Sequence, residues 1–258
     1  MNAVNNTIQA VERTLEVIKM LSNSKDGVSI TQLSQDVHLH KATISRILKT
    51  LKQGNFVEQN PDNSKYFLGT GFLEISLNYL ENMDLRKTAL PYMLALQEKT
   101  GETINLAILD NFEVIYIERI DSKQDLRHSV SVGKRAPAYC TSLGRAILAH
   151  SDMQYVKEKL FSTPLKKLTD FTTVEPNKIL EKLDEVNSKG YAIDDREHQN
   201  HIRCVGSPIF RSDGKVVGAI SISGPEIRIG LNTIKQYSEY LISSAASISA
   251  ELGWRKNQ

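Results

Sequence analysis

The sequence is poor in cysteine, with two in 258 residues and no CxxC pair. Cys140 and Cys204 lie far apart in the chain, which argues against a disulfide framework and against a structural zinc module. Long hydrophobic runs are also missing, since no apolar stretch reaches about 18 residues and charges such as Glu12, Arg13 and Glu16 interrupt the N-terminal one. We therefore expect a protein of the reducing cytoplasm, without a signal peptide or a membrane span.

A large excess of charge of one sign is absent as well, because 32 Lys and Arg stand against 30 Asp and Glu. A chain so close to neutrality has no general attraction for polyanions, so contact with nucleic acid depends on a local cluster of cations. A length of 258 residues accommodates one or two domains, and we expect two.

One cationic cluster lies in residues 29–57, SITQLSQDVHLHKATISRILKTLKQGNFV. At 100° per residue, apolar positions 44, 47, 48 and 51 fall on one stripe of a helix, which predicts a core-facing side. The opposite side carries small, hydroxyl-bearing and cationic residues and no acid. These residues are Lys41, Ala42, Thr43, Ser45, Arg46, Lys49 and Thr50.

The flanking residues predict two more helices and a hairpin. Thr7 is a candidate cap for a helix that begins at Ile8, and Ser29 and Gln32 have the spacing of a capping box for a second helix. Gly54 is expected to end the third helix as a left-handed residue. NFVEQNPDNSKYFLG then predicts strand, turn and strand.

Three helices followed by a hairpin are typical of a winged helix-turn-helix, whose second motif helix enters the major groove of DNA. On this interpretation Thr43, Ser45 and Arg46 reach base edges, with Ala42 and Thr50 beside them. The phosphate backbone is held by Lys41, Lys49, Asn63 and Lys65. The alternative is a solvated helix face. Residues 1–69 hold eight Lys and Arg against six acids, so one unit alone would bind weakly and we expect a dimer on two half-sites.

Beyond residue 70 the pattern predicts a connector helix and then a mixed α+β domain. Residues 72, 73, 77, 80 and 83 are apolar at near-helical spacing, and this stripe either packs on its own domain or contacts a second chain. Further helices are predicted at 88–101, with Pro91 in the first turn or at a kink and Gly101 at the end, and at 142–150, 175–190 and 231–252. Strands are predicted at 103–110, 113–120, 126–133, 191–194, 202–210 and 215–223, with turns at Asn111-Phe112 and Asp213-Gly214.

Three separated segments of this second domain place small polar groups beside apolar strands. TSLGRA begins a helix, whose free backbone N–H groups can receive a carboxylate. Asp194 ends one strand, Cys204 lies on another, and Ser221 and Ser223 share one face of a third. Together they suit a short hydroxy- or keto-acid. The structural alternatives are a strand-end cap for Asp194, backbone hydrogen bonds for the serines and an inert packed thiol for Cys204.

A rival interpretation combines Cys204 with His198 or His201 and with Asp194 or Asp195 as a nucleophilic centre of a hydrolase. No nucleophile elbow surrounds Cys204, so spacing alone supports it weakly. A metal-dependent sensor that uses both cysteines and the same histidines is a second rival, but HQNH is an i, i+3 spacing and no i, i+4 pair occurs. We expect no enzyme activity, no cofactor and no metal.

Several segments carry a resemblance to a known family. IQAVERTLEVIKML, the ITQLS helix, HKATISRILKTL, GNFVEQ and KYFLG closely resemble the isocitrate-lyase-regulator (IclR) family of bacterial transcription factors. The likeness continues in TGETINLAILD, GKRAPAYCTSLGRAILA, GYAIDDREH, IRCVGSPIF and GAISISGPEIR. RIDSKQDLRHSVSVGKRAPAY looks most like the branch of sugar-acid regulators that respond to ketodeoxygluconate.

The resemblance implies a winged helix-turn-helix domain at 1–70, a connector helix at 71–84 through which chains dimerise, and a GAF-like α/β effector-binding domain at 85–256. It implies a repressor of carbohydrate or organic-acid catabolism genes that acts on double-stranded operator DNA as a homodimer or a dimer of dimers. The implied effector is a small carboxylate such as a keto-deoxy sugar acid. The implied effector contacts are Ala136, Ser142, Leu143, Asp194, Ile202, Cys204, Ser221 and Ser223, with Arg127 and His128 as further partners for a longer sugar acid.

The sequence departs from the family pattern at one point of this site. In the run HQNHIRC, Asn200-His201 replaces the family's usual glycine before Ile202-Arg203. If that glycine lets the backbone approach the ligand, we expect His201 to narrow or reshape the effector site.

Overall fold

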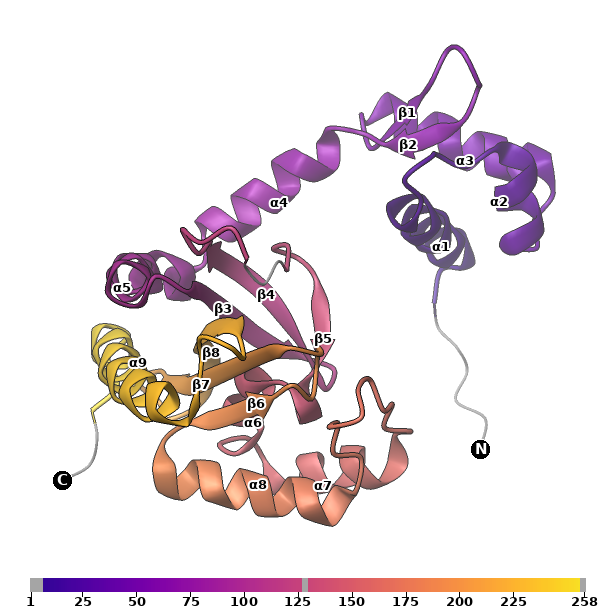
Figure 1. Cartoon of the computed structure of the whole chain (residues 1–258). Helices are drawn as coiled ribbons and strands as arrows, with labels where there is room; N and C mark the ends of the chain where they lie inside the picture. The colour runs from indigo at the N-terminus through magenta and orange to yellow at the C-terminus, as the bar shows by residue number, and fades with distance from the viewer. Residues whose placement is uncertain (1–6, 127–129, 256–258) are drawn as a thin grey trace. The chain divides into compact units, whose positions relative to one another are not determined.

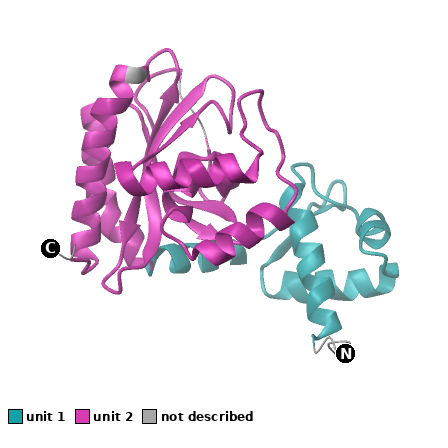
Figure 2. Ribbon diagram, turned by 90° about the horizontal axis from the view of Figure 1, so that it is seen from below, with its two compact units in different colours: residues 1–82 teal, residues 83–258 magenta. Residues whose placement is uncertain are grey.

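The structure is a computed structural model that describes residues 7–126 and 130–255. It divides into two compact units, an N-terminal unit of residues 1–82 and a C-terminal unit of residues 83–258 (Figure 2). Each unit has a hydrophobic core of its own, so each is described by itself. None of the helices formed by the described residues is long and apolar enough to cross a bilayer.

The N-terminal unit has the predicted order of three helices and a hairpin, followed by a fourth helix (Figure 1). Its core is made by Val17, Leu21, Leu33, Ile44 and Leu48. The hairpin strands pair antiparallel and form the wing. The elements are α1 (Gln9–Asn23), α2 (Ile30–Asp36), α3 (Lys41–Gln53), β1 (Val57–Gln59), β2 (Tyr66–Leu68) and α4 (Gly71–Glu81).

The starts of α1 and α2 differ in how they are capped. Ile8 occupies the N-cap position of α1 and no side chain bonds there, so the predicted cap at Thr7 is wrong. Ile8, Val11 and Leu15 near the start of α1 are exposed, and the helix buries Val17 and Leu21 nearer its C-terminal end. The prediction for α2 is confirmed, since the Ser29 hydroxyl accepts a hydrogen bond from the Gln32 N–H at 3.2 Å.

The end of α3 also differs from the prediction. Gly54 has φ −92°, so it is not the left-handed residue. Asn55 is left-handed instead, with φ +60°, a conformation that Asn tolerates better than most residues.

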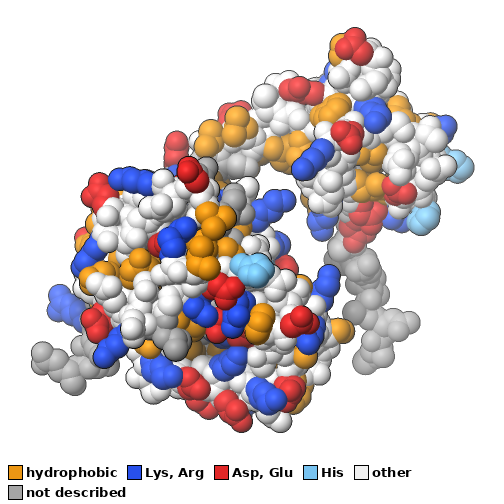
Figure 3. Space-filling model, viewed as in Figure 1, with side chains coloured by type: hydrophobic (Ala, Val, Ile, Leu, Met, Phe, Trp, Pro, Cys, Tyr) orange, Lys and Arg blue, Asp and Glu red, His pale blue; other side chains and the backbone are white. Residues whose placement is uncertain are grey.

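The predicted connector helix is present as α4, and only its first turn is held by its own unit. Phe72 packs edge-on against Phe56 with ring centroids 5.0 Å apart, and the Gly71 N–H donates to the Asn55 carbonyl at 2.9 Å. Further along, the apolar side chains lie in solvent and can be seen as orange atoms along α4 (Figure 3). These exposed residues are Leu73, Ile75, Leu77 and Tyr79.

The C-terminal unit is built on one antiparallel sheet with strand order β5-β4-β3-β8-β7-β6. Helices α5 and α9 cover one face, and α6 and α8 cover the other (Figure 1). The strands are β3 (Thr103–Asp110), β4 (Glu113–Ile120), β5 (Arg135–Pro137), β6 (Ala192–Asp195), β7 (Ile202–Phe210) and β8 (Val216–Pro225). The helices are α5 (Asp84–Thr100), α6 (Ser142–Leu148), α7 (Met153–Ser162), α8 (Pro176–Lys189) and α9 (Leu231–Glu251), with a short 3-10 helix η1 (Ala138–Cys140) before α6.

Most of the predicted elements of this unit are present, with two corrections. Helix α5 begins at Asp84, so Pro91 lies in its interior and not in its first turn. The strand predicted at 126–133 is wrong in its described part, because residues 130–133 form no strand and the sheet continues at β5. The tight turn between β3 and β4 is confirmed, with left-handed Asn111 and Phe112 at φ +49° and +67°.

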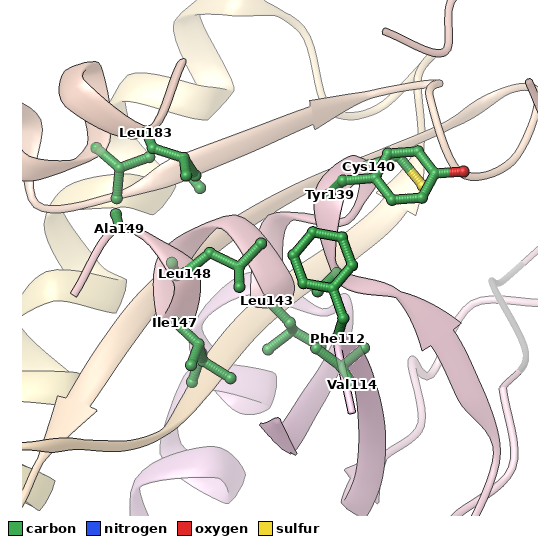
Figure 4. Packing of buried hydrophobic residues seen from close by; sticks show 14 of the residues in the cluster. Phe112, Val114, Tyr139, Cys140, Leu143, Ile147, Leu148, Ala149 and Leu183 are labelled. Atoms are coloured by element: carbon green, nitrogen blue, oxygen red, sulfur yellow. The ribbon is translucent and has the colours of Figure 1, made fainter. Parts of the chain in front are cut away.

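Helix α6 lies directly on the sheet, and its apolar side makes the centre of the core. Leu143, Ile147 and Leu148 pack with Phe112 and Val114 from the neighbouring strand and turn (Figure 4). The close approach depends on Gly206 in β7, since a Cβ atom there would lie 2.6 Å from the carbonyl carbon and oxygen of Ser142. The missing side chain at Gly206 thus makes room on the sheet for the first turn of α6.

Substituting Gly206 by Ala tests this packing. The added methyl group has to push α6 away from β7, and we expect a loss of about 1 to 3 kcal/mol of unfolding free energy in urea titrations. Gly230→Ser is the control, because open space surrounds a Cβ atom at that helix N-cap and Ser is favoured there. Equal stability of Gly206→Ala and the unaltered protein would contradict the close approach.

Candidate functional site

The polar side of α3 is a free surface. Eight of the nine residues predicted to face DNA are exposed, and Lys65 in the wing is half-buried. Across residues 7–126 and 130–255, no acidic side chain forms an ion pair with Lys41, Arg46 or Lys49. The cations of α3 therefore keep their charge available for an external partner.

The start of α3 lacks the features that normally stabilise a helix terminus. His40 at the N-cap forms no side-chain hydrogen bond, and Lys41 places a cation in a first turn that has no acid. Both features oppose the helix dipole, whose positive end favours anions. The same features suit a phosphate group at this terminus, because the N–H groups and Lys41 then share one anion.

Two of the predicted DNA-facing side chains are also engaged within their own element. The Thr50 hydroxyl donates to the Arg46 carbonyl at 3.0 Å, and the Asn63 side-chain oxygen accepts from the Lys65 N–H at 2.9 Å. Thr50 is therefore fixed on the helix surface, and Asn63 holds the wing turn in shape.

A groove of about 470 Å³ runs between α3 and α1. Thr43 and Arg46 line it from α3, and Gln9 and Arg13 line it from α1. The sequence pattern missed the two α1 residues, because nothing in the spacing of one helix indicates which neighbour lies beside it.

In the C-terminal unit, the register of the sheet brings the predicted polar residues into one row. Asp194 on β6 pairs with Cys204 on β7, and Cys204 pairs with Ser223 on β8. Ser221 lies on the same face of β8, one pleat along. All four are buried, on the face that α6 covers.

Asn105 on β3 completes this row and was not predicted. Its side-chain NH2 group donates to the hydroxyls of Ser221 and Ser223 at 3.4 and 3.1 Å. We call Asp194, Cys204, Ser221, Ser223 and Asn105 the polar row. An asparagine inside an otherwise apolar strand was the available signal, since a buried amide requires polar partners.

The remaining predicted effector residues lie at different distances from the polar row. Ser142 and Leu143 form the first turn of α6 above Gly206, and Ile202 is on the face of Cys204, one pleat nearer the strand end. Ala136 lies on β5, two strands away from Asn105 on β3, and it packs in the same core cluster as Leu143. Arg127 and His128 lie outside the described residues.

Asp194 is the charged member of the polar row. One of its carboxylate oxygens accepts hydrogen bonds from the Glu197 and His198 N–H groups, so the predicted role as a strand-end cap is real. Burial raises the pKa of Asp194 to about 7, against the opposing charge of Arg145 and these two N–H groups. Near neutral pH this group therefore exists both as carboxylate and as carboxylic acid.

A buried ion pair lies beside Asp194. The Arg145 guanidinium on α6 holds both carboxylate oxygens of Glu197 at 2.7 Å, and Lys182 on α8 adds a contact at 2.8 Å. Burial alone would raise the pKa of Glu197, but Arg145 and Lys182 hold it at about 2. No local pattern of residues indicates this pair, because its members lie 52 positions apart.

The segment of residues 163–175 is hydrogen-bonded to the residues that follow β6. The hydroxyls of Thr169 and Thr172 donate to the carbonyls of Arg196 and Glu197 at 2.7 and 2.6 Å. The Arg196 guanidinium also lies 3.9 Å from the centre of the Phe171 ring. The end of β6, next to the polar row, is thereby held in place from outside the sheet.

His201 does not narrow the site, so that prediction is wrong. Its φ is +64°, and its side chain is 85% exposed and contacts Glu226 at 3.0 Å. The left-handed backbone explains why a glycine suits this position, and His adopts that conformation more readily than most residues. The backbone geometry is kept, and the imidazole points away from the polar row.

Neither rival interpretation gains support from the geometry. Burial raises the pKa of both thiols, that of Cys140 to about 12, so neither cysteine is an activated nucleophile. Within the described ranges 7–126 and 130–255, no three His, Cys, Asp or Glu side chains are placed to hold a metal ion.

A winged helix-turn-helix unit joined to an α/β unit with a buried polar site defines a DNA-binding regulator with an effector domain. Two family models match the chain: the IclR helix-turn-helix domain over residues 10–61, and the bacterial transcriptional regulator IclR C-terminal domain over residues 77–250. The chain belongs to the IclR family. It is a transcriptional regulator and not an enzyme, as expected.

Individual relatives agree with this membership. The chain is 33% identical over 248 residues to the HTH-type transcriptional regulator KdgR of Escherichia coli K12, covering 96% of this chain and 94% of the relative. An IclR transcriptional regulator from Alicyclobacillus acidocaldarius has a similar solved structure, with TM-score 0.84, 28% identity and coverage of 96% and 100%. A Microbacterium hydrocarbonoxydans IclR homologue complexed with 4-hydroxybenzoate has TM-score 0.82, 25% identity and coverage of 95% and 99%.

The raised pKa of Asp194 predicts a stability that depends on pH. Between about pH 4 and 7 the unfolded chain releases the Asp194 proton while the folded protein keeps it, so folding loses stability as pH rises through this window. Asp194→Asn removes the titrating group and retains an oxygen for the two N–H donors. We expect its unfolding free energy to exceed that of the unaltered protein by about 2 to 4 kcal/mol at pH 8, with little gain at pH 4.

Asp195→Asn is the matched control in the next position. Although burial opposes it, the guanidinium groups of Arg196 and Arg203 lower the pKa of Asp195, so this variant should lose stability at pH 8. A gain for Asp194→Asn that stays constant between pH 4 and 8 would show that Asp194 ionises at its ordinary pKa.

Proposed function

We propose that residues 1–70 bind operator DNA with α3 in the major groove. Thr43, Ser45 and Arg46 contact base edges, with Ala42 and Thr50 beside them. The backbone contacts come from Lys41, Lys49, Asn63 and Lys65. The observation that carries this proposal is the row of exposed α3 cations without an internal ion pair among the described residues, next to a helix start that lacks an anion.

We propose further that the protein acts as a homodimer or a dimer of dimers, with residues 71–84 as the connector through which two chains meet. The apolar surface of α4 supports this, since four of its large side chains lie in solvent. The near-balance of charge in residues 1–69 supports it too, because two α3 helices on two half-sites neutralise more phosphates than one.

For residues 85–256 the proposed effector is a small carboxylate, such as a keto-deoxy sugar acid. The N–H groups at the start of α6 lie above the polar row and suit the carboxylate, and the polar row suits its hydroxyl or keto groups. The likeness to the regulator KdgR and to a homologue that binds the carboxylate 4-hydroxybenzoate supports this class of ligand.

The proposed protein is a cytoplasmic repressor of carbohydrate or organic-acid catabolism genes. A ligand changes DNA affinity only if it binds unequally to the DNA-competent and incompetent arrangements of the chain. The connector is the element through which such a difference passes. Coupling of this kind typically changes affinity by about 5- to 150-fold.

Arg46→Ala tests the DNA-binding proposal. Loss of one charged base contact should weaken binding to the protein's own promoter region by about 1 to 3 kcal/mol and reduce the preference for that sequence, measured by fluorescence anisotropy. A footprint over two half-sites separated by whole helical turns is expected for the dimer.

Arg211→Ala serves as the charge-matched control, because this exposed arginine lies on the turn between β7 and β8 and pairs with Asp213. Its operator affinity and salt dependence should equal those of the unaltered protein. If Arg46→Ala binds the promoter as tightly as Arg211→Ala, the DNA-reading role of α3 is excluded.

Calorimetric titration of the full chain with keto and hydroxy acids tests the effector proposal. At least one acid should bind and change the operator affinity within the range given above. Because the charge of a bound carboxylate opposes the ionisation of Asp194, binding near pH 7 should take up protons, which appear as a dependence of the heat on the buffer. Absence of heat with every acid, together with unchanged operator affinity, would remove this proposal.

A further inference from the structure

Asn105 has one polar end that the protein leaves unused. The residue is 1% exposed, its NH2 group bonds to Ser221 and Ser223, and its side-chain oxygen has no hydrogen-bond partner among the described residues. A buried amide oxygen without a partner costs about 1 to 3 kcal/mol, so such groups call for an explanation. A bound ligand is the simplest one here, because the amide lies in the polar row.

The hydroxyl groups of Ser221 and Ser223 can donate as well as accept, so they are compatible with two orientations of the Asn105 amide. If the amide turns over, its oxygen accepts from Ser221 and Ser223 and its NH2 group becomes the unused end. In either orientation one polar end is free. A hydroxyl group, which both donates and accepts, satisfies either one.

Tyr116 on β4 is a second buried polar group on this side of the sheet. It pairs with Ala107, two residues from Asn105, and therefore lies on the same face. Its side chain is buried, and the described residues offer its hydroxyl no hydrogen bond. Burial raises the pKa of Tyr116, and the charges of Cys204 and Asp194 raise it further.

The strand order sets the distance between these groups and the start of α6. Ser142 stands over Gly206 on β7, and β3 is two strands away, a separation of about 10 Å at 4.8 Å per strand. Two hydrogen bonds of about 2.9 Å leave about 4 Å between the ligand oxygens at the two ends. In a linear acid, a hydroxyl group on the third or fourth carbon can lie at about this distance from a carboxylate oxygen, and pyruvate has no hydroxyl group.

We propose that Asn105 and Tyr116 bind a hydroxyl group of the effector and so select acids with a hydroxyl group on the third or fourth carbon over acids that have none. This inference rests on the proposed effector function and names the part of the ligand that decides specificity. The carboxylate binds at the start of α6, and the hydroxyl at the far end satisfies the unused end of Asn105.

Ketodeoxygluconate and pyruvate are suitable probes, since they share the keto-acid head and differ in the hydroxylated tail. Calorimetry on the full chain should show that the unaltered protein prefers ketodeoxygluconate. Asn105→Leu and Tyr116→Phe should each lower this preference by about 10- to 100-fold, because each variant should lose more affinity for ketodeoxygluconate than for pyruvate. Tyr116→Phe removes only a hydroxyl group, so it keeps the test valid if Asn105→Leu does not fold.

Gln97→Leu is the matched control. Gln97 is also a buried amide with an unused end, but it belongs to α5 on the opposite face of the sheet, so the preference should not change. An unchanged preference in both site variants, or an unaltered protein that binds the two acids equally, overturns the inference and leaves the effector proposal standing. Failure of the unaltered protein to bind either acid counts against the effector proposal itself.

Discussion

The buried contact between Arg145 and Glu197 holds together the segments that meet at the polar row. It links α6 to the chain that follows β6, and Lys182 and the Thr173 N–H link the same carboxylate to α8 and to residues 163–175. Taking two charges out of water is costly, and it succeeds only when nearly every polar atom is bonded. Here Arg145 also donates to the carbonyls of Tyr139 and Ile193. Such a pair contributes a defined geometry more than a large net stability.

The geometry set by the Arg145–Glu197 contact matters because few other contacts fix the positions of the residues in the polar row. The members of the polar row have small side chains and come from four strands. Helix α6 can cover them only because Gly206, which has no side chain, lets the first turn of α6 approach the sheet. Because α6 and β6 are fixed, the members of this row keep a defined arrangement. The raised pKa of Asp194 follows from the same burial, so the packing that shapes the site also sets its charge.

The fold could be predicted from sequence wherever the signal is local. The stripe of Ile44 and Leu48 identified the core side of α3, and the turn at Asn111-Phe112 identified a hairpin, since both depend on neighbouring residues alone. Local signals failed where alternatives are nearly equal in energy, as at the end of α3, where Asn55 and not Gly54 is left-handed.

The candidate site was only partly predictable for the same reason. Ser221 and Ser223 share a face by strand alternation, which the sequence reveals. Asn105 joins them through a strand pairing between residues 116 positions apart, and the orientation of His201 depends on a backbone angle. Neither this long-range strand pairing nor the backbone angle at His201 can be inferred from the spacing of residues along the sequence.

The burial of the two thiols has a consequence for the signals that the protein detects. Peroxide and alkylating agents react with the thiolate form of cysteine, and burial raises the pKa of Cys140 to about 12, so this form is rare at pH 7. Burial also raises the pKa of Cys204, inside the polar row. The two cysteines of this unit therefore offer an oxidant or an alkylating agent little reactive thiolate.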